Sequence, residues 1–370
     1  MQLGSSLRLL PASSLALVLG LAATVGPSRA AAQLRGILPS PTQPFYLGAD
    51  SREPLPQIQI NNFTVGLSFY VQPQFEWVDP QGGSAEGSFR VRRARASMRG
   101  TAYTRFNYLI QIDMAGSSTR LVDGWIGTEL HPLLVVAAGQ AKAPFGRQQL
   151  TSDTGLQFVD RGILDPRFNP ARQPGMWVSG TLADGLTYSA GIFNGDGINQ
   201  LNLDGDYLKA ARVVWNPLGA FALEESSLDF PESPRVSVGA GVMSGRYGTT
   251  DYTAQRLGLE GAFKLQGFNA VGEFVVEQLD SDLDPTRDTA GWYVQAGYLL
   301  RAGYELAGRY GTIDPDTQDA ITPDLTEKGF SLSRYFNGHD MKIQADYLRV
   351  ESETDGTSDD RVRVQWQLRI

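Results

Sequence analysis

Polar and apolar side chains alternate without interruption over the last ten residues, 361–370 ("RVRVQWQLRI"). Successive side chains of a β-strand point to opposite faces, so this segment is predicted to be a strand with one apolar and one cationic face. The same pattern recurs over 105–114, 291–300 and 341–348, with Leu109 as an exception in the first of these. Runs of about ten residues match the length of a tilted strand that crosses a membrane.

Counting these runs predicts sixteen strands. We expect them near residues 67–79, 88–100, 102–114, 119–130, 133–142, 174–183, 185–194, 207–216, 235–247, 252–265, 267–279, 289–300, 302–313, 326–336, 340–351 and 359–370. Tight turns alternate with longer polar loops, which is typical of outer-membrane barrels. Segment 216–234 departs from this rule, because it is long where a short turn is expected. The predicted fold is therefore all-β, a transmembrane antiparallel β-barrel of about 16 strands, and a soluble β-sandwich is the alternative.

The charges indicate which face of each strand meets lipid. An arginine at the lipid-facing midplane of a barrel costs about 2–4 kcal/mol, so Arg361, Arg363 and Arg369 are expected to face the lumen. A barrel of this size is wide enough to hold an aqueous channel. Aromatic residues near strand ends are expected to form interfacial girdles. These residues are Trp77, Trp125, Trp215, Tyr347 and Trp366.

Composition excludes several function classes. The chain has 370 residues, no cysteine, two histidines and a net charge of −8. Thiol chemistry and cysteine-based zinc sites are therefore excluded, and a nucleic-acid partner has no global electrostatic support. His131 and His339 are expected in tight turns with no serine or acid placed beside them, which disfavours an enzyme. The sequence indicates no cofactor and no metal site.

The N-terminus is typical of an exported protein. Residues 1–32 are predicted to be a signal peptide, with an apolar run over 13–26 that is too short to span a bilayer. An uncleaved anchor is the alternative. Removal of 1–32 takes away Arg8 and Arg29 and no acid, so the mature charge becomes −8 − 2 = −10. Residues 33–62 are rich in proline and are predicted to form an irregular periplasmic lead-in, which leaves 63–370 for the barrel.

The strand predicted over 88–100 is the most charged in the chain. One face carries Arg93, Arg95 and Arg99, and Arg90 and Arg92 break the alternation near one end, where a rim could solvate them. Guanidinium groups stacked on a pore wall offer a path for anions, because each presents donors that match phosphate or carboxylate oxygens. The alternative is that these arginines pair with lumen carboxylates, for which Asp113 and Glu129 are candidates. The small side chains of Ala94 and Ala96 on the other face are a candidate subunit contact.

More than thirty residues separate the strands near 133–142 and 174–183. Loops of this length are usually functional, and in a porin the natural place for one is inside the lumen as a constriction. We expect a constriction loop over about 143–173, and an exposed loop is the alternative. The loop carries four arginines and three aspartates. They are Arg147, Arg161, Arg167, Arg172, Asp153, Asp160 and Asp165.

The motifs "FRVRRARASMRG", "GQAKAPFG", "FVDRG", "NPARQPG" and "GIFNGDG" resemble the phosphate-selective porin O/P family of Gram-negative outer membranes. The resemblance implies a sixteen-stranded trimeric porin whose third extracellular loop folds into the pore and whose arginine ladder guides anions. Matched motifs carry this role to Arg92, Arg93, Lys142, Arg161, Arg172 and Arg212. The chain departs from the pattern in having no lysine in 143–173 and in ending in Ile370, where phenylalanine is usual.

Together these features predict an outer-membrane porin for passive diffusion of small anions, with phosphate among them. The predicted anion path consists of Arg92, Arg93, Arg95, Arg99, Lys142, Arg147, Arg161, Arg172, Arg212, Arg309 and Arg363. The expected partners are small anions, outer-membrane lipid, lipopolysaccharide and two further copies of the chain. Two alternatives stay open: a general porin with weak or cation-tolerant selectivity, and a plugged structural or adhesin barrel without conductance.

Overall fold

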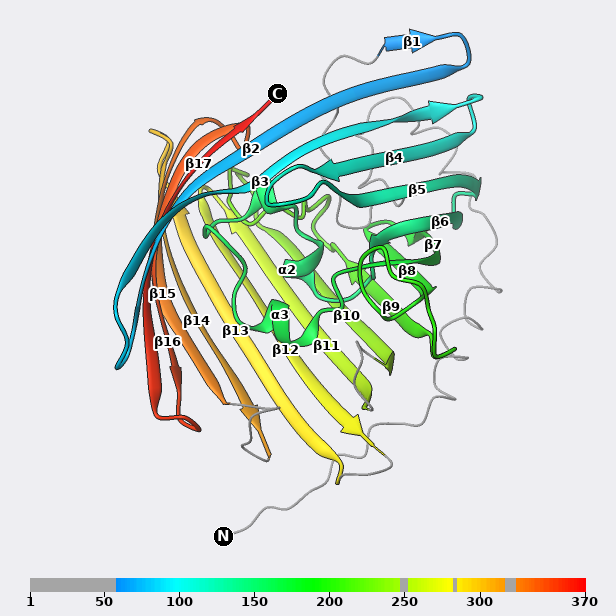
Figure 1. Ribbon diagram of the computed structural model, residues 1–370. Helices are drawn as coiled ribbons and strands as arrows, with labels where there is room; N and C mark the ends of the chain where they lie inside the picture. Colours follow the sequence, from blue (N-terminus) through cyan, green and yellow to red (C-terminus); the bar gives the residue numbers. More distant parts are fainter. Residues whose placement is uncertain (1–57, 247–251, 282–284, 317–323) are drawn as a thin grey trace. The chain divides into compact units, whose positions relative to one another are not determined.

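The computed structural model describes residues 58–246, 252–281, 285–316 and 324–370 (Figure 1). These residues belong to one compact unit, Thr42–Ile370. The predicted signal peptide and most of the predicted lead-in lie outside the described residues. No helix in the described part of the chain is long and apolar enough to cross a membrane.

Sixteen antiparallel strands form a closed β-barrel within the described residues. They are β2 (Phe63–Pro80), β3 (Glu86–Ala102), β4 (Phe106–Asp113), β5 (Arg120–His131), β6 (Leu134–Lys142), β7 (Arg172–Ala183), β8 (Leu186–Phe193), β9 (Leu208–Trp215), β10 (Arg235–Arg246), β11 (Thr253–Leu265), β12 (Phe268–Asp280), β13 (Arg287–Leu299), β14 (Tyr304–Pro315), β15 (Leu325–Asn337), β16 (Met341–Ser352) and β17 (Thr357–Arg369). Each strand pairs with the next, and β17 pairs with β2, which closes the ring. Every predicted strand is present, with boundaries that differ by four residues at most.

A further short strand, β1 (Ile58–Ile60), pairs with the start of β2. The sequence placed these residues in the irregular lead-in, which is wrong for this part. Asn61 turns the chain with a φ of 50°, a left-handed conformation that asparagine adopts more readily than most residues.

The predicted alternation of faces is confirmed in β17. Arg363, Gln365 and Gln367 are at most 3% exposed, because other parts of the protein cover them inside the barrel. Trp366 and Ile370 lie on the outside and are 46% and 60% exposed. The polar face of the strand therefore lines the interior, and the apolar face forms the outer surface.

A β-bulge in β3 explains the two arginines that broke the alternation. Gln72 of β2 pairs with Arg93, whereas Pro73 pairs with Val91, so Arg92 is an extra residue. The bulge shifts the alternation by one position. Arg90 and Arg92 therefore lie on the polar side of the strand, where they make ion pairs while their side chains stay 44% and 35% exposed.

The segment between β6 and β7, residues 143–171, lies inside the barrel, and we call it the inner loop (Figure 1). It contains two short α-helices and a 3-10 turn, none of which the sequence indicated. They are α2 (Arg147–Leu150), η4 (Asp153–Gly155) and α3 (Leu164–Phe168). Its side chains and backbone contact wall strands on several sides of the ring, including β3, β12, β14 and β16.

Glycines in the wall make room for aromatic side chains of the inner loop. A Cβ built on Gly241 or Gly258 would lie 3.2 Å from the Phe145 ring, and one on Gly291 would lie 2.6 Å from the Phe168 ring. Both phenylalanines are fully buried in the apolar cluster between loop and wall. The abundant glycine of the strands therefore serves the contact with the loop as well as turns.

The apolar cluster also accounts for two residues that the sequence misplaced. Leu109, the exception in its strand, is buried inside the barrel with this cluster. Trp125, predicted as a girdle residue, is buried there too and meets the Trp177 ring edge-on at 6.1 Å. Trp215 and Trp366, by contrast, are exposed on the outside, as expected for a girdle.

The unexpectedly long segment 216–234 between β9 and β10 also reaches into the barrel, and we call it the inner turn. Its buried part includes Phe221, Glu225 and Ser226. Glu225 donates its backbone N–H to the carbonyl of Gly155 in the inner loop. Two segments that enter from opposite ends of the barrel therefore meet inside it.

Candidate functional site

The structure places all eleven cations of the predicted anion path on the inner face of the barrel or on the inner loop. Four come from β3, two from the inner loop, and one each from β6, β7, β9, β14 and β17. Arg92 is the most accessible of them, with 35% of its side chain exposed, and the others are largely buried. These cations therefore differ mainly in the carboxylate or carbonyl groups that they contact.

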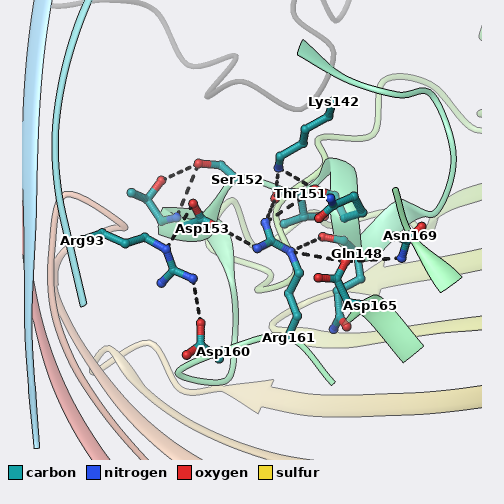
Figure 2. A network of polar contacts seen from close by, with 12 residues as sticks. Arg93, Lys142, Gln148, Thr151, Ser152, Asp153, Asp160, Arg161, Asp165 and Asn169 are labelled. Atoms are coloured by element: carbon teal, nitrogen blue, oxygen red, sulfur yellow. Dashed lines mark hydrogen bonds and ion pairs between the residues drawn. The ribbon is translucent and has the colours of Figure 1, made fainter. Parts of the chain in front are cut away.

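Asp153 of η4 is the centre of the first group (Figure 2). Its carboxylate lies 2.5 Å from Arg95 Nη1, 2.6 Å from Arg161 Nη1 and 3.3 Å from Arg93 Nε. Burial alone would raise the pKa of this carboxyl group. Arg93, Arg161 and Arg95 lower that pKa well below its usual range, so Asp153 stays ionised.

Asp160, at the far side of the inner loop, is the centre of the second group (Figure 2). Its Oδ1 lies 2.7 Å from Arg93 Nη2, and its Oδ2 lies 3.1 Å from Arg92 Nε and 3.8 Å from Arg363 Nη1. Its backbone carbonyl accepts hydrogen bonds from both terminal nitrogens of Arg309 at 3.2 Å. Burial raises the pKa of its carboxyl group, but the three guanidinium groups outweigh that effect and lower it.

We call the six guanidinium groups around these two aspartates the arginine sector. It consists of Arg92, Arg93, Arg95, Arg161, Arg309 and Arg363. Wall carboxylates pair with it as well. Arg95 Nε lies 2.9 Å from Asp113, the partner that the sequence suggested, and Arg363 holds Asp346 with two bonds of 2.9 and 2.7 Å. Glu129, the other suggested partner, is exposed near the end of β5.

Lys142 fixes the inner loop. Its Nζ donates to the carbonyl oxygens of Gln149 at 2.5 Å and Thr151 at 3.1 Å, at the end of α2 (Figure 2). Arg161 adds bonds to the carbonyls of Gln148 and Thr151 at 2.9 and 2.6 Å. Two cations therefore satisfy the carbonyl groups that a short helix leaves without intrahelical partners.

The other end of α2 rests on a carboxylate of the wall. Glu273 of β12 accepts the backbone N–H groups of Arg147 and Gln148, each at 2.7 Å. These are the free donors of a helix N-terminus, where negative charge is favourable. The Arg147 side chain lies 3.7 Å from Glu260, which Arg212 holds with bonds of 2.8 and 2.5 Å.

One predicted residue differs from expectation in its setting. Arg172 is the first residue of β7 rather than part of the loop, and its guanidinium holds Asp123 with bonds of 3.0 and 3.1 Å. Arg99 is buried in β3 on the face where the sequence placed it, together with Arg93 and Arg95.

Glu225 of the inner turn is a functional candidate that sequence reasoning missed. Its carboxylate accepts the N–H of Gln157 at 2.8 Å and the side-chain amides of Gln295 at 2.9 Å and Gln148 at 3.2 Å. The carboxylate therefore joins the inner turn, the inner loop and the wall. The unusual length of 216–234 was the available signal.

His339 also differs from its predicted setting. It is buried, and its Nε2 lies 3.6 Å from Glu224 of the inner turn. The expectation that no acid lies beside it is therefore wrong, because an acid 115 positions earlier in the chain folds against it. In the described part of the chain, no group of three or more acidic, histidine or cysteine residues could hold a metal ion.

The chain is similar to known proteins. The family model described as "Phosphate-selective porin O and P" matches residues 65–370. Porin O of Pseudomonas aeruginosa is 23% identical over 325 residues, which covers 76% of this chain and 72% of Porin O.

Solved porins share the fold. The anion-selective porin from Comamonas acidovorans superposes with a TM-score of 0.61 at 12% identity, over 83% of this chain and all of that one. OmpT of Vibrio cholerae in a trimer form superposes with a TM-score of 0.55 at 12% identity, over 82% of this chain and 99% of that one. The family match spans nearly the whole barrel, and the family and the barrel fold indicate a channel rather than an enzyme. The chain therefore belongs to the phosphate-selective porin O and P family and forms an outer-membrane porin channel of a Gram-negative bacterium.

Proposed function

We propose that this porin passes small anions, phosphate among them, by passive diffusion along its lumen-facing cations. The observation that carries the proposal is the arginine sector, in which six guanidinium groups from the wall and the inner loop gather on one side of the lumen. Rings of arginine or lysine select anions in pores, and the guanidinium fork matches the oxygens of phosphate and carboxylate. The name of the family and of its relative Porin O agree with this assignment.

The inner loop is proposed to narrow the channel. Lys142 and Glu273 fix α2 near the start of the loop, and the arginine sector fixes its middle, so the loop is held across the lumen by charges at several points. The proposed path follows the eleven cations predicted from the sequence, with Arg92 the most accessible to a solute. We also propose that residues 1–32 are a signal peptide that directs export, and that residues 33–57 form a periplasmic lead-in.

A general porin with weak selectivity is the second candidate. The observation that favours it is the pairing of the arginine sector with carboxylates, which removes much of its net positive charge. These carboxylates are Asp113, Asp153, Asp160, Glu327 and Asp346.

Single-channel recording in a planar bilayer separates the two candidates. We expect added phosphate to reduce the KCl current of the refolded wild-type channel, and Arg92→Gln to raise the phosphate concentration needed for half block. Lys328→Gln is a matched control, because that lysine is exposed near the start of β15 and pairs with Glu351. Current that phosphate does not reduce in either channel would favour the general porin.

We further propose that three copies assemble through the outer face of β2–β4 and the C-terminus. An apolar groove lies there, lined by Leu67, Phe69, Ala96, Ile110 and Ile370. The rest of the outer surface is proposed to contact lipid and lipopolysaccharide.

The trimer form of OmpT supports this assembly. We expect Ala96→Arg to abolish the trimer band in native gels while leaving the barrel folded, with Val238→Arg on the far side of the ring as a control. A trimer band that survives Ala96→Arg would place the interface elsewhere.

A further inference from the structure

Asp160 occupies the point where the arginine sector is most accessible. Its side chain is 15% exposed, against 3% for Asp153, and its neighbour Arg92 is 35% exposed. The contacts of Asp160 come from three strands, with Arg92 and Arg93 on β3, Arg309 on β14 and Arg363 on β17. A solute in the lumen can therefore approach Asp160 but not Asp153.

The geometry around Asp160 is that of an oxyanion site. Its two carboxylate oxygens accept from different guanidinium groups, at 2.7 Å from Arg93 and 3.1 Å from Arg92. Its backbone carbonyl oxygen accepts hydrogen bonds from both terminal nitrogens of Arg309, which fixes the backbone at this point. A phosphate or a free carboxylate can accept from the guanidinium groups that hold the side-chain carboxylate, because its oxygens are anionic acceptors of the same kind.

The bulge in β3 is what allows this convergence. Without the extra residue, neighbouring side chains of a strand would point to opposite faces, and Arg92 and Arg93 could not share one carboxylate. The bulge brings both to the lumen side, where they meet the same aspartate.

We propose that Asp160 is a specificity-determining residue of the channel: it is a built-in anion that fills an oxyanion site formed by Arg92, Arg93 and Arg363, and a permeating oxyanion must displace its carboxylate to bind there. The proposal rests on the proposed function of the arginine sector. The resident carboxylate also explains how a site with several arginines can release the anion that it binds. A site must bind well enough to attract an ion and weakly enough to release it, and a tethered competitor weakens binding without removing the arginines.

The first test compares the wild type with Asp160→Asn. The variant keeps the shape of the side chain and removes its charge, so the arginines lose their resident anion. We expect the phosphate concentration for half block of the current to fall about tenfold, the size of one charged hydrogen-bonded contact. Asp184→Asn, in the exposed turn after β7, changes the net charge equally and serves as the control.

The second test restores the charge within a single channel. The chain has no cysteine, so Asp160→Cys introduces one reactive thiol. The neutral cysteine channel should show the same tight phosphate block as Asp160→Asn. Reaction with a sulfonate-bearing methanethiosulfonate should return the half-block concentration towards the wild-type value, and reaction with an uncharged methanethiosulfonate should leave it low.

Three results would overturn the proposal. One is a half-block concentration in Asp160→Asn within about twofold of the wild type, which is less than a charged contact contributes. Another is an equal shift in Asp184→Asn, which would mean that net charge alone acts. The third is failure of both neutral variants to form channels, because a carboxylate that acts only as a competitor is dispensable for folding. A wild-type channel that prefers cations would refute the proposed function, yet Asp160→Asn should still move it towards anions.

Discussion

The docking of the inner loop depends on Phe145, and its truncation gives the sharpest prediction about the lumen. The ring is fully buried and packs against Gly241 and Gly258. A Cβ atom at either glycine would lie only 3.2 Å from the ring, so the close contact depends on glycine. Phe145→Ala leaves a cavity that these glycines cannot fill, because neither has a side chain to move into it. Truncations of this kind cost about 3–5 kcal/mol.

That cost falls on the loop rather than on the barrel. The wall is closed by strand pairing that Phe145 does not join, so the barrel should remain folded. Part of the docking energy of the inner loop is lost, and the loop should sample positions away from the wall. We expect a larger and noisier single-channel conductance than in the wild type, and faster protease cleavage within 143–171.

The assay is single-channel recording at fixed KCl, together with the heat-modified mobility of the barrel on gels. Ile126→Ala is the matched control, since that side chain lies on the outer face and is half exposed. Conductance and cleavage that match the wild type, in a variant whose barrel is intact, would refute the claim that this contact holds the loop.

Three further predictions follow from the same contacts. Gly291→Val should loosen the inner loop as Phe145→Ala does, because a Cβ at this position would lie 2.6 Å from the Phe168 ring. Single-channel conductance should rise, and an unchanged conductance would contradict the contact between Gly291 and Phe168. Glu225→Ala removes the acceptor of three hydrogen bonds that join the inner turn to the loop and wall, so conductance should rise and hydrogen exchange at Gln157 should speed up. Asp153 has a depressed pKa in the folded protein, so its stabilising effect is complete above the ordinary carboxyl pKa of about 3.9 and is lost only as pH falls through the depressed value. The difference in free energy of unfolding between the wild type and Asp153→Asn should therefore stay constant from pH 7 down to about pH 4.5, and a difference that changes within that window would contradict the ion-paired loop.

The barrel could be predicted from the sequence because its signal is local. Lumen and outer residues alternate with a period of two, and each strand repeats the pattern independently. Arg361, Arg363 and Arg369 were enough to assign the faces of the last strand, because arginine is costly in lipid. The exceptions were informative as well, since Leu109 marks the place where the wall turns apolar to receive the inner loop.

The site could be predicted only in part, because its contacts join residues far apart in the chain. The residue types around Asp153 and Asp160 were visible, but which arginine meets which carboxylate depends on the path of the loop through the lumen. The change of alternation at Arg92 depends on a β-bulge, which the residue types in this strand do not predict. The contact between Glu224 and His339 depends on the inner turn, whose length alone was visible.

The reversal potential of the refolded wild-type channel across a KCl gradient tests the central claim most directly. The account predicts a potential that shows preference for chloride over potassium, because the arginine sector leaves Arg92 accessible on the lumen side. A preference for potassium would mean that the paired carboxylates dominate the lumen, and would contradict the anion path.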